Sequence, residues 1–213
     1  MKAPLVKICG ISTSQALDAC IAARADFVGF VFYPPSPRNI TPSNARQLSE
    51  RAAGRIATVG LFVDPDDLEI GEAVQAARLD VIQLHGKETP ERTAQIKARF
   101  GLPVWKALPV ASAYDVERAL DYRQAADVIL FDAKTPKGTL PGGMALAFDW
   151  SLLAGYRGAS AWGLAGGLTP DNVGDALRVT AAPLVDTSSG VESAPGVKDM
   201  DRIAAFCTAA RTL

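Results

Sequence analysis

The stretch that decides the fold is Leu5-Val6-Lys7-Ile8-Cys9-Gly10-Ile11-Ser12-Thr13-Ser14. Its first half is a short apolar run typical of a buried strand, and Ser12-Thr13-Ser14 is a signal for the start of a helix. Cys9 therefore stands at the end of a strand, just before the chain turns into a helix. At such a position a side chain meets solvent and ligand rather than core, and the rest of the chain repeats the same strand-then-helix unit.

The other strand candidates are also short, rich in β-branched residues and bounded by turn residues, as buried parallel strands are. The eight candidates are Leu5–Cys9, Asp26–Phe32, Arg55–Val63, Asp80–His85, Pro103–Leu108, Asp127–Asp132, Ser160–Leu164 and Pro183–Thr187. Helical spacing of apolar residues lies between them, at Ser14–Ala25, Asn44–Ala53, Asp67–Ala77, Pro90–Phe100, Tyr114–Tyr122, Pro170–Val179 and Asp199–Ala210. We expect Thr169 to be the N-cap of the helix that starts at Pro170. After the sixth strand we expect a short or irregular helix.

Strict alternation of strand and helix predicts right-handed βαβ crossovers and a parallel sheet. Eight repeats suggest that this sheet closes into an α/β fold of the (β/α)8 TIM-barrel type. Because the chain has 213 residues, fewer than the roughly 250 of a typical barrel, we expect a single domain over residues 1–213 with few insertions. An open doubly wound sheet is the alternative, but Cys9-Gly10-Ile11-Ser12 lacks the GxGxxG pattern of its first turn.

The composition limits the functional classes. Hydrophobic residues make up 48% of the chain and charged residues 21%, as in an ordinary soluble globular protein. A formal net charge of −1 provides no basic field for nucleic acid or an anionic membrane. We find no membrane-spanning run and no signal-peptide pattern, and three irregularly spaced cysteines match neither a disulfide framework nor a zinc site. We therefore expect a cytoplasmic enzyme with reduced thiols and no nucleic-acid or membrane partner.

Polar residues at the carboxyl ends of the strands are the site candidates, because these ends form the active face of such barrels. They are Cys9, Arg38, Asp64, His85, Asp132, Asp186 and the stretches Gly166-Gly167 and Ser188-Ser189-Gly190. If Cys9 and Asp132 both point inward, they approach one another across the barrel mouth. Each has a structural alternative: a cysteine is often a small core residue, as we expect for Cys20 and Cys207, and an aspartate can form a turn or cap.

The single histidine, His85, limits the chemistry further. One histidine excludes a multi-histidine metal site, and no Ser/His/Asp order is evident. Beside a glycine turn it is more often structural or substrate-contacting than a catalytic base.

Two glycine-containing strand ends predict a phosphate site. Gly166-Gly167 exposes backbone N–H groups just before a helix, and Ser188-Ser189-Gly190 does the same one strand later. Phosphate binding at the loops after strands seven and eight recurs in these barrels and is helped by helix dipoles. The alternative is that the glycines only permit tight turns. We favour phosphate, and therefore a phosphorylated substrate of modest size.

Several short motifs fall in order at the predicted strand ends and loops. They are Lys7-Ile8-Cys9-Gly10, Gly29-Phe30-Val31-Phe32, Ser36-Pro37-Arg38, Gln83-Leu84-His85-Gly86, Phe131-Asp132, Pro141-Gly142-Gly143, Phe148-Asp149-Trp150, Gly166-Gly167-Leu168-Thr169-Pro170-Asp171-Asn172-Val173 and Asp186-Thr187-Ser188-Ser189-Gly190-Val191-Glu192. Together they make the chain resemble the phosphoribosylanthranilate isomerase family, which performs an Amadori rearrangement in tryptophan biosynthesis. One stretch departs from the family pattern: Met144-Ala145 stands where a small residue and another glycine are usual, which restricts the backbone of that loop.

The resemblance implies a role for each candidate in converting N-(5-phosphoribosyl)anthranilate to 1-(2-carboxyphenylamino)-1-deoxyribulose 5-phosphate. Asp132 is the general acid that protonates the ring oxygen as the ribose opens, and Cys9 is the general base that then removes the C2 proton. The binding residues are Arg38 for the anthranilate carboxylate, His85 and Asp186 for the sugar, and the backbone of Gly166, Gly167, Ser188 and Ser189 for the phosphate. Lys7, if it points inward, is a candidate for lowering the pKa of the Cys9 thiol. The resemblance implies no metal or organic cofactor, and its family contains monomers and homodimers.

Three alternatives remain open at this stage. Lys106 on the fifth strand favours indole-3-glycerol-phosphate synthase as an alternative, because ring closure in that enzyme uses lysine and glutamate at strand ends. Cys9 and Asp132 argue against this alternative. A sugar-phosphate isomerase of histidine biosynthesis would have aspartate in place of Cys9. In a non-catalytic phosphosugar-binding barrel, Cys9 would be incidental.

Overall fold

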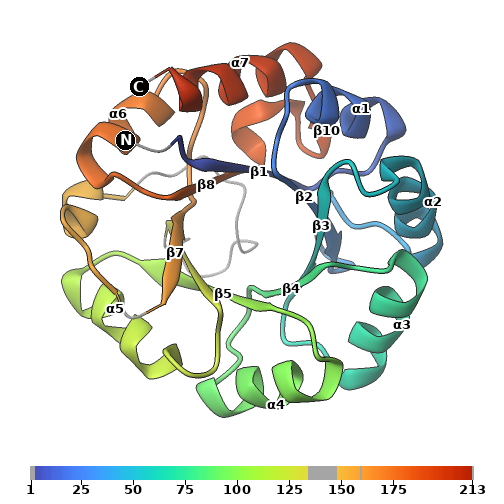
Figure 1. Ribbon diagram of the computed structural model, residues 1–213, viewed down its shortest axis with the longest axis horizontal. Helices are drawn as coiled ribbons and strands as arrows, with labels where there is room; N and C mark the ends of the chain where they lie inside the picture. Colours follow the sequence, from blue (N-terminus) through green and yellow to red (C-terminus); the bar gives the residue numbers. More distant parts are fainter. Residues whose placement is uncertain (1–2, 134–147, 159, 213) are drawn as a thin grey trace.

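The computed structural model describes residues 3–133, 148–158 and 160–212, and its centre is a closed barrel of parallel strands in the order β1 to β8 (Figure 1). The strands are β1 (Leu5–Cys9), β2 (Phe27–Phe32), β3 (Ala57–Phe62), β4 (Val81–Leu84), β5 (Val104–Val110), β6 (Val128–Ala133), β7 (Ala161–Leu164) and β8 (Leu184–Thr187). The predicted closed (β/α)8 barrel is thus confirmed. The motif Pro141-Gly142-Gly143 and the departure at Met144-Ala145 lie outside the described residues.

Helices surround the barrel, and a small hairpin follows its last strand (Figure 1). The helices are α1 (Ser14–Ala22), α2 (Pro42–Ala52), α3 (Asp67–Ala77), α4 (Pro90–Phe100), α5 (Ala113–Glu117), α6 (Val173–Thr180) and α7 (Met200–Arg211), with the 3-10 helices η1 (Arg118–Tyr122), η2 (Trp150–Leu153) and η3 (Ser189–Val191). The antiparallel strands β9 (Glu192–Ala194) and β10 (Val197–Lys198) form the hairpin between η3 and α7.

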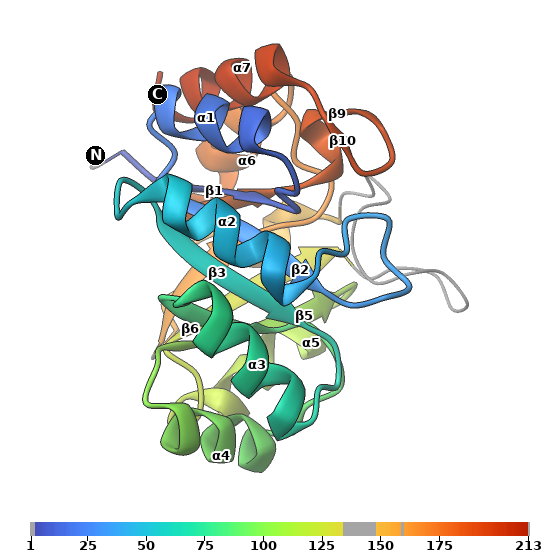
Figure 2. The same ribbon diagram turned by 90° about the vertical axis from the view of Figure 1, so that its right-hand side faces the viewer.

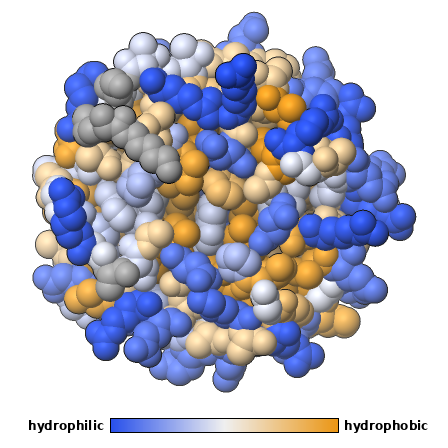
Figure 3. All heavy atoms as spheres, in the orientation of Figure 1, coloured by the Kyte–Doolittle hydropathy of each residue, from blue (hydrophilic) through white to orange (hydrophobic). Residues whose placement is uncertain are grey.

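Apolar side chains fill the barrel toward the amino ends of its strands. This layer consists of Val59, Val81, Trp105, Ala107, Leu130 and Leu184, and Phe27 packs edge-on against Trp105. On the face seen in Figure 3, hydrophilic residues lie mainly around the outer ring, and hydrophobic residues lie nearer the middle. In Figure 2 the two termini lie on one side of the barrel and the loop between β2 and α2 lies on the other. Because one end of the barrel is packed with apolar side chains, polar chemistry is confined to the other end.

Three aspartates explain why several strands begin one residue later than predicted. The Oδ2 atoms of Asp26, Asp80 and Asp127 accept hydrogen bonds from the backbone N–H groups of Val6, Thr58 and Val104 at 2.8, 2.7 and 2.8 Å. Each aspartate precedes a strand and bonds to the strand before it, so the three carboxylates link β1 with β2, β3 with β4 and β5 with β6. The three aspartates therefore link the amino ends of neighbouring strands and are not part of the strands themselves.

The helix after β7 differs from the prediction. Thr169 is not its N-cap, because α6 begins at Val173. The Asn172 side chain accepts from the Thr169 N–H at 2.8 Å and donates to the Gly167 carbonyl at 2.9 Å. These bonds close a turn over residues 169–172, so Pro170 lies in this turn rather than in the first turn of the helix.

The helix predicted over Tyr114–Tyr122 also differs, since it divides into α5 and the tighter η1. After β6 the described residues contain the 3-10 helix η2, which agrees with the short or irregular helix expected there. Elsewhere the agreement is close. The bounds of β1, α3 and α4 are those predicted, and α2 starts two residues early because Thr41 caps it and Pro42 occupies its first turn.

Cys20 on α1 and Cys207 on α7 are buried core residues, as predicted. Burial raises the pKa of the Cys20 thiol to about 12 and that of the Cys207 thiol to about 11. In the unfolded chain a thiol has its ordinary pKa of 9.0. Above this pH the unfolded chain releases a proton that the folded protein keeps, so the free energy of unfolding falls as the pH rises.

We predict that the Cys20 thiol costs the wild type about 2 kcal/mol of unfolding free energy between pH 8 and pH 10.5. Cys20→Ala removes this term, although it lowers stability at every pH by leaving a cavity. Urea unfolding of both proteins at the two pH values measures the difference. Identical pH dependence in the two proteins would show that the thiol is not responsible.

Candidate active site

A pocket opens at the carboxyl ends of the strands, and the empty space within it, including the part open to solvent, is about 680 Å³. It is lined by every residue predicted to be catalytic or to bind the substrate or its phosphate: Cys9, Arg38, His85, Asp132, Gly166, Gly167, Asp186, Ser188 and Ser189. Val31, Leu61 and Val63 add an apolar wall. Asp64, a candidate by position alone, instead accepts a hydrogen bond from the backbone N–H of Lys87.

Cys9 lies above a buried ion pair inside the barrel. Lys7 shares a face of β1 with Cys9, is fully buried, and its Nζ lies 2.9 Å from Asp186 Oδ2. A Cβ added to Gly29 on β2 would be 2.8 Å from Cys9 Sγ and 3.2 Å from Lys7 Nζ. The thiol and the ammonium therefore converge over the one position of β2 that has no side chain.

Lys7 points inward and lowers the pKa of the Cys9 thiol, as predicted, but the net shift of that pKa is upward. Burial raises the pKa of the Cys9 thiol, and the opposing influence of Lys7 does not overcome it. For Lys7, burial alone would lower the pKa, but Asp186 and Cys9 outweigh it and raise the pKa. A charged ammonium therefore lies beside a thiol that rests in its protonated form, and it stabilises the thiolate whenever the proton leaves.

Asp132 on β6 is held by a chain of hydrogen bonds from β4. Its Oδ2 lies 2.9 Å from His85 Nε2, and Gln83 Nε2 lies 3.2 Å from His85 Nδ1. When the Gln83 amide donates to Nδ1, the His85 proton is on Nε2 and is donated to Asp132. Asp132 Oδ1 accepts from the backbone N–H of Ala133 at 2.8 Å. Gln83 was quoted in a motif without a role, because only the fold shows that it orients His85.

The two predicted phosphate loops lie side by side and are fastened together. Gly166 and Gly167 both have positive φ, +82° and +66°. Thr187 Oγ1 donates to the Leu168 carbonyl at 2.7 Å, and Ser188 Oγ donates to the Cys9 carbonyl at 3.0 Å. The ends of β7, β8 and β1 are thereby joined around the same side of the pocket.

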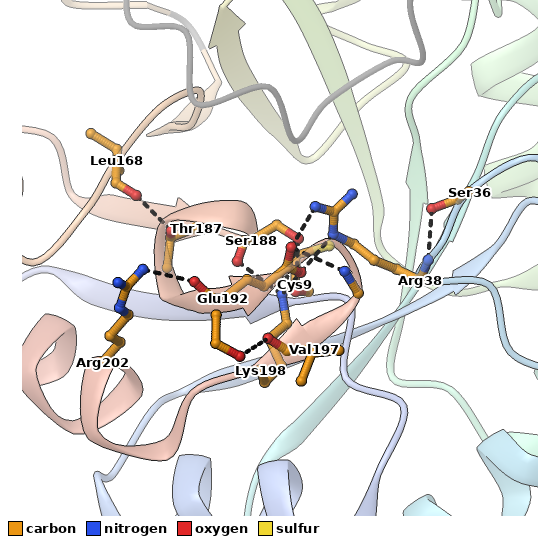
Figure 4. Close-up of polar contacts among 12 residues, drawn as sticks. Cys9, Ser36, Arg38, Leu168, Thr187, Ser188, Glu192, Val197, Lys198 and Arg202 are labelled. Carbon is orange, nitrogen blue, oxygen red and sulfur yellow. Dashed lines mark hydrogen bonds and ion pairs between the residues drawn. The ribbon is translucent and has the colours of Figure 1, made fainter.

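Arg38 has an unexpected partner (Figure 4). Its Nε and Nη2 donate to the two carboxylate oxygens of Glu192, each at 2.7 Å, and Lys198 Nζ donates to Glu192 Oε1 at 2.7 Å. Sequence reasoning missed both partners: Glu192 ended a quoted motif without a role, and nothing in the sequence distinguished Lys198. Both lie on the hairpin that follows β8.

Lys106 does not belong to the pocket. It is buried and pairs with Glu88 at 3.1 Å, and it is absent from the residues that line the pocket. The feature that favoured indole-3-glycerol-phosphate synthase is therefore structural. Within residues 3–133, 148–158 and 160–212, no group of His, Cys, Asp and Glu is placed to hold a metal ion. In the same part of the chain no helix is long and apolar enough to cross a membrane.

The fold and the pocket define a (β/α)8-barrel protein with a thiol, a carboxyl group and two glycine- and serine-containing loops at the barrel mouth. A family model described as N-(5'-phosphoribosyl)anthranilate (PRA) isomerase matches residues 6–209. The chain belongs to this family, as the sequence motifs indicated.

Individual members of the family are similar to this chain along nearly its whole length. The N-(5'-phosphoribosyl)anthranilate isomerase of Paramagnetospirillum magneticum is 56% identical over 207 residues, 97% of this chain and 96% of that protein. The isomerase of Paracoccus denitrificans is 55% identical over 94% of both chains. A crystal structure of phosphoribosyl anthranilate isomerase from Thermotoga maritima superposes with a TM-score of 0.88 at 41% identity, covering 99% of this chain and 100% of that one.

We predict that Gly166→Ala disrupts the site. At its φ of +82° an alanine is strained, and its Cβ would lie 2.3 Å from Ala133 N and 2.7 Å from Asp132 Oδ1. Displacement of Asp132 should lower kcat/KM by about 10²-fold. The matched control is Gly101→Ala, which has a φ of +65° and no heavy atom within 4 Å of the new Cβ. It should lose about 1–2 kcal/mol of stability and keep full activity. Full activity in Gly166→Ala would be inconsistent with this placement of Asp132.

Proposed function

We propose that Cys9 is the general base and Asp132 the general acid of the reaction that this chain, an N-(5'-phosphoribosyl)anthranilate isomerase, catalyses in tryptophan biosynthesis. The observation that carries the proposal is the shared pocket: the thiol, the carboxyl group and both loops line one cavity at the barrel mouth. The reaction is an Amadori rearrangement, in which an aldose derivative becomes a ketose derivative without any external oxidant.

Binding fixes the substrate at its two ends. The phosphate is held by backbone N–H groups of Gly166, Gly167, Ser188 and Ser189, and Arg38 meets the anthranilate carboxylate. Asp186 contacts a sugar hydroxyl, which is supported by its Oδ1, a buried oxygen without a hydrogen-bond partner among the described residues. A crystal structure of a phosphoribosyl anthranilate isomerase in complex with reduced 1-(o-carboxyphenylamino)-1-deoxyribulose 5-phosphate superposes with a TM-score of 0.86 at 39% identity, covering 99% of this chain and 100% of that one.

Ring opening is the acid step. The Asp132 carboxyl group gives its proton to the ribose ring oxygen while the C1–O bond breaks, and the nitrogen lone pair forms the C1 iminium. The His85 N–H donates to Oδ2 of the same carboxyl group, so the acid is oriented by β4. His85 therefore keeps the Asp132 carboxyl group in place, and it also lines the pocket, where it contacts the sugar.

Removal of the C2 proton is the base step. The Cys9 thiol first releases its proton to solvent, before the substrate closes the pocket. The iminium then acidifies C2, the Cys9 thiolate takes the C2 proton, and the electrons of the C–H bond move toward the nitrogen to give an enolamine. The enolamine then tautomerises to the ketone product. After the product leaves, Asp132 regains a proton from solvent and the Cys9 thiol gives one up, which restores the starting state. Lys7 supplies the positive charge that stabilises the thiolate, and the apolar wall of Val31 and Leu61 keeps water from the reacting atoms. These steps involve only protons and substrate electrons, so the proposal includes no cofactor or metal.

We also propose that the protein works in the cytoplasm as a monomer or homodimer, with a small phosphorylated substrate and no nucleic-acid partner. Its three cysteines are free and buried, which suits a reducing compartment. The isomerase of Thermotoga maritima is described as dimeric, and monomers generated from it have also been crystallised. Sedimentation of the purified chain distinguishes the two states.

Cys9→Ala should abolish turnover and leave the fold and phosphate binding intact. A general base contributes about 10²–10⁴-fold, so the decay of substrate fluorescence should slow at least that much. Cys20→Ala and Cys207→Ala are the controls, and they should change stability more than rate. Retention of more than about a tenth of wild-type kcat would overturn the assigned role and favour a non-catalytic use of this cysteine.

Asp132→Asn should lower kcat by about 10²–10⁴-fold with little change in KM, as expected of a group that acts only in the transition state. Asparagine keeps the shape and hydrogen-bonding ability of the side chain but has no transferable acid proton. Melting temperature and kcat are measured on the same preparation. A destabilised but fully active variant would mean that Asp132 is structural, and Asp186 would be the next acid to test.

A further inference from the structure

Behind the pocket, two cations and one carboxylate form a buried cluster (Figure 4). Arg38, Glu192 and Lys198 are 8%, 7% and 5% exposed. Arg38 lines the pocket, whereas Glu192 and Lys198 do not. The carboxylate therefore contacts the substrate-facing arginine from the side away from the pocket. Such a residue acts through Arg38 rather than on the substrate.

The guanidinium group is fixed in direction by two contacts. Glu192 occupies Nε and Nη2 in a bidentate pair, which leaves the Nη1 edge to meet an anion. The aliphatic part of Arg38 lies across Gly10, where an added Cβ would be 2.6 Å from Arg38 Cδ. An arginine side chain has several rotatable bonds, so without these contacts it would occupy many orientations.

The same carboxylate also fastens the hairpin to the phosphate loop. Lys198 Nζ donates to Glu192 and also to the Ser188 carbonyl at 2.9 Å, while the Gly196 N–H donates to Glu192 Oε2 at 3.2 Å. Because a peptide unit is planar and trans, fixing the Ser188 carbonyl fixes the opposite direction of the Ser189 N–H. Glu192 thus joins the segment that carries Arg38 to the loop that carries Ser189.

The charges of the cluster support this arrangement. Burial would raise the pKa of the Glu192 carboxyl group, but Arg38 and Lys198 outweigh it and lower that pKa. Burial lowers the pKa of Lys198, and Glu192 opposes that effect. Two cations against one carboxylate leave one positive charge to meet an anionic group. Without the carboxylate, the two cations would repel each other in a poorly solvated site.

We propose that Glu192 is a positioning residue that aims Arg38 at the aromatic carboxylate of the substrate and thereby sets the specificity for that carboxylate. The inference rests on the proposed binding role of Arg38. It predicts that loss of Glu192 reduces the recognition of one substrate group more than it reduces binding as a whole.

The test compares two inhibitors that differ only in that group: reduced 1-(o-carboxyphenylamino)-1-deoxyribulose 5-phosphate and the corresponding phenylamino compound without the carboxylate. The ratio of their dissociation constants measures carboxylate recognition, and general damage to the pocket weakens both compounds alike. We expect the ratio of the wild type to fall by about tenfold or more in Glu192→Gln and in Arg38→Met, since each loses a charge-assisted interaction.

Glu88→Gln is the matched control. Glu88 is also a buried glutamate paired with a lysine, but it contacts neither Arg38 nor the hairpin, so its ratio should equal that of the wild type. If Glu192→Gln does not fold, as judged by its melting temperature, Glu192→Asp takes its place. Aspartate keeps the charge but is one methylene shorter, so the ratio should still fall.

The outcomes separate the inference from the function on which it rests. A ratio that falls in Arg38→Met but stays at the wild-type value in the Glu192 variants would overturn the positioning role alone. An unchanged ratio in Arg38→Met would overturn the carboxylate-binding role of Arg38, and the inference with it. A fall in Glu88→Gln equal to that in Glu192→Gln would show that the effect is general and would also overturn the inference.

Discussion

The buried ion pair of Lys7 and Asp186 is the constraint on which the rest of the site depends. The two residues face each other in the register of β1 with β8, the strand pair that closes the barrel, and their charged atoms are 2.9 Å apart. Lys7 has no exposed surface, so loss of Asp186 would leave an uncompensated charge inside the barrel, a change that typically costs about 3–5 kcal/mol. The same ion pair therefore stabilises the closed barrel and forms the floor of the site.

This pair lies directly below Cys9, so the contact between β1 and β8 also determines the properties of the thiol. Burial that excludes water raises the thiol pKa, and the Lys7 ammonium opposes that rise. The result is a thiol that is protonated at rest beside a charge that favours its ionised form. A more exposed cysteine would ionise more easily but would be a weaker base, because basicity falls with the pKa. The contact of β1 with β8 thus gives the base proposed here, the Cys9 thiolate, a high proton affinity and a fixed partner for its charge.

The sequence could predict what depends on position along a strand, but not what depends on contacts between distant loops. Cys9 and Asp132 were found because strand ends in a barrel meet at one mouth, and the pocket contains both. Glu192 and Lys198 were missed because their contact with Arg38 spans 154 positions of the chain in the case of Glu192. The error at Thr169 is local: propensity favoured a cap, but the side chain of Asn172 closes a competing turn.

The charges of the pocket are divided between two sides of the barrel. Lys7, Arg38 and Lys198, with their partners Asp186 and Glu192, lie in or behind one side of the pocket, on β1, the β2–α2 loop, β8 and the hairpin after it, whereas Asp132 comes from β6. In the proposed reaction, a substrate with a carboxylate and a phosphate is attracted to the side that carries these cations, which leaves the uncharged ribose ring facing Asp132. If the cations were spread around the mouth, either end of the substrate could lie near Asp132. Under this proposal, the separation of the cations from Asp132 determines which substrate atoms receive and lose protons.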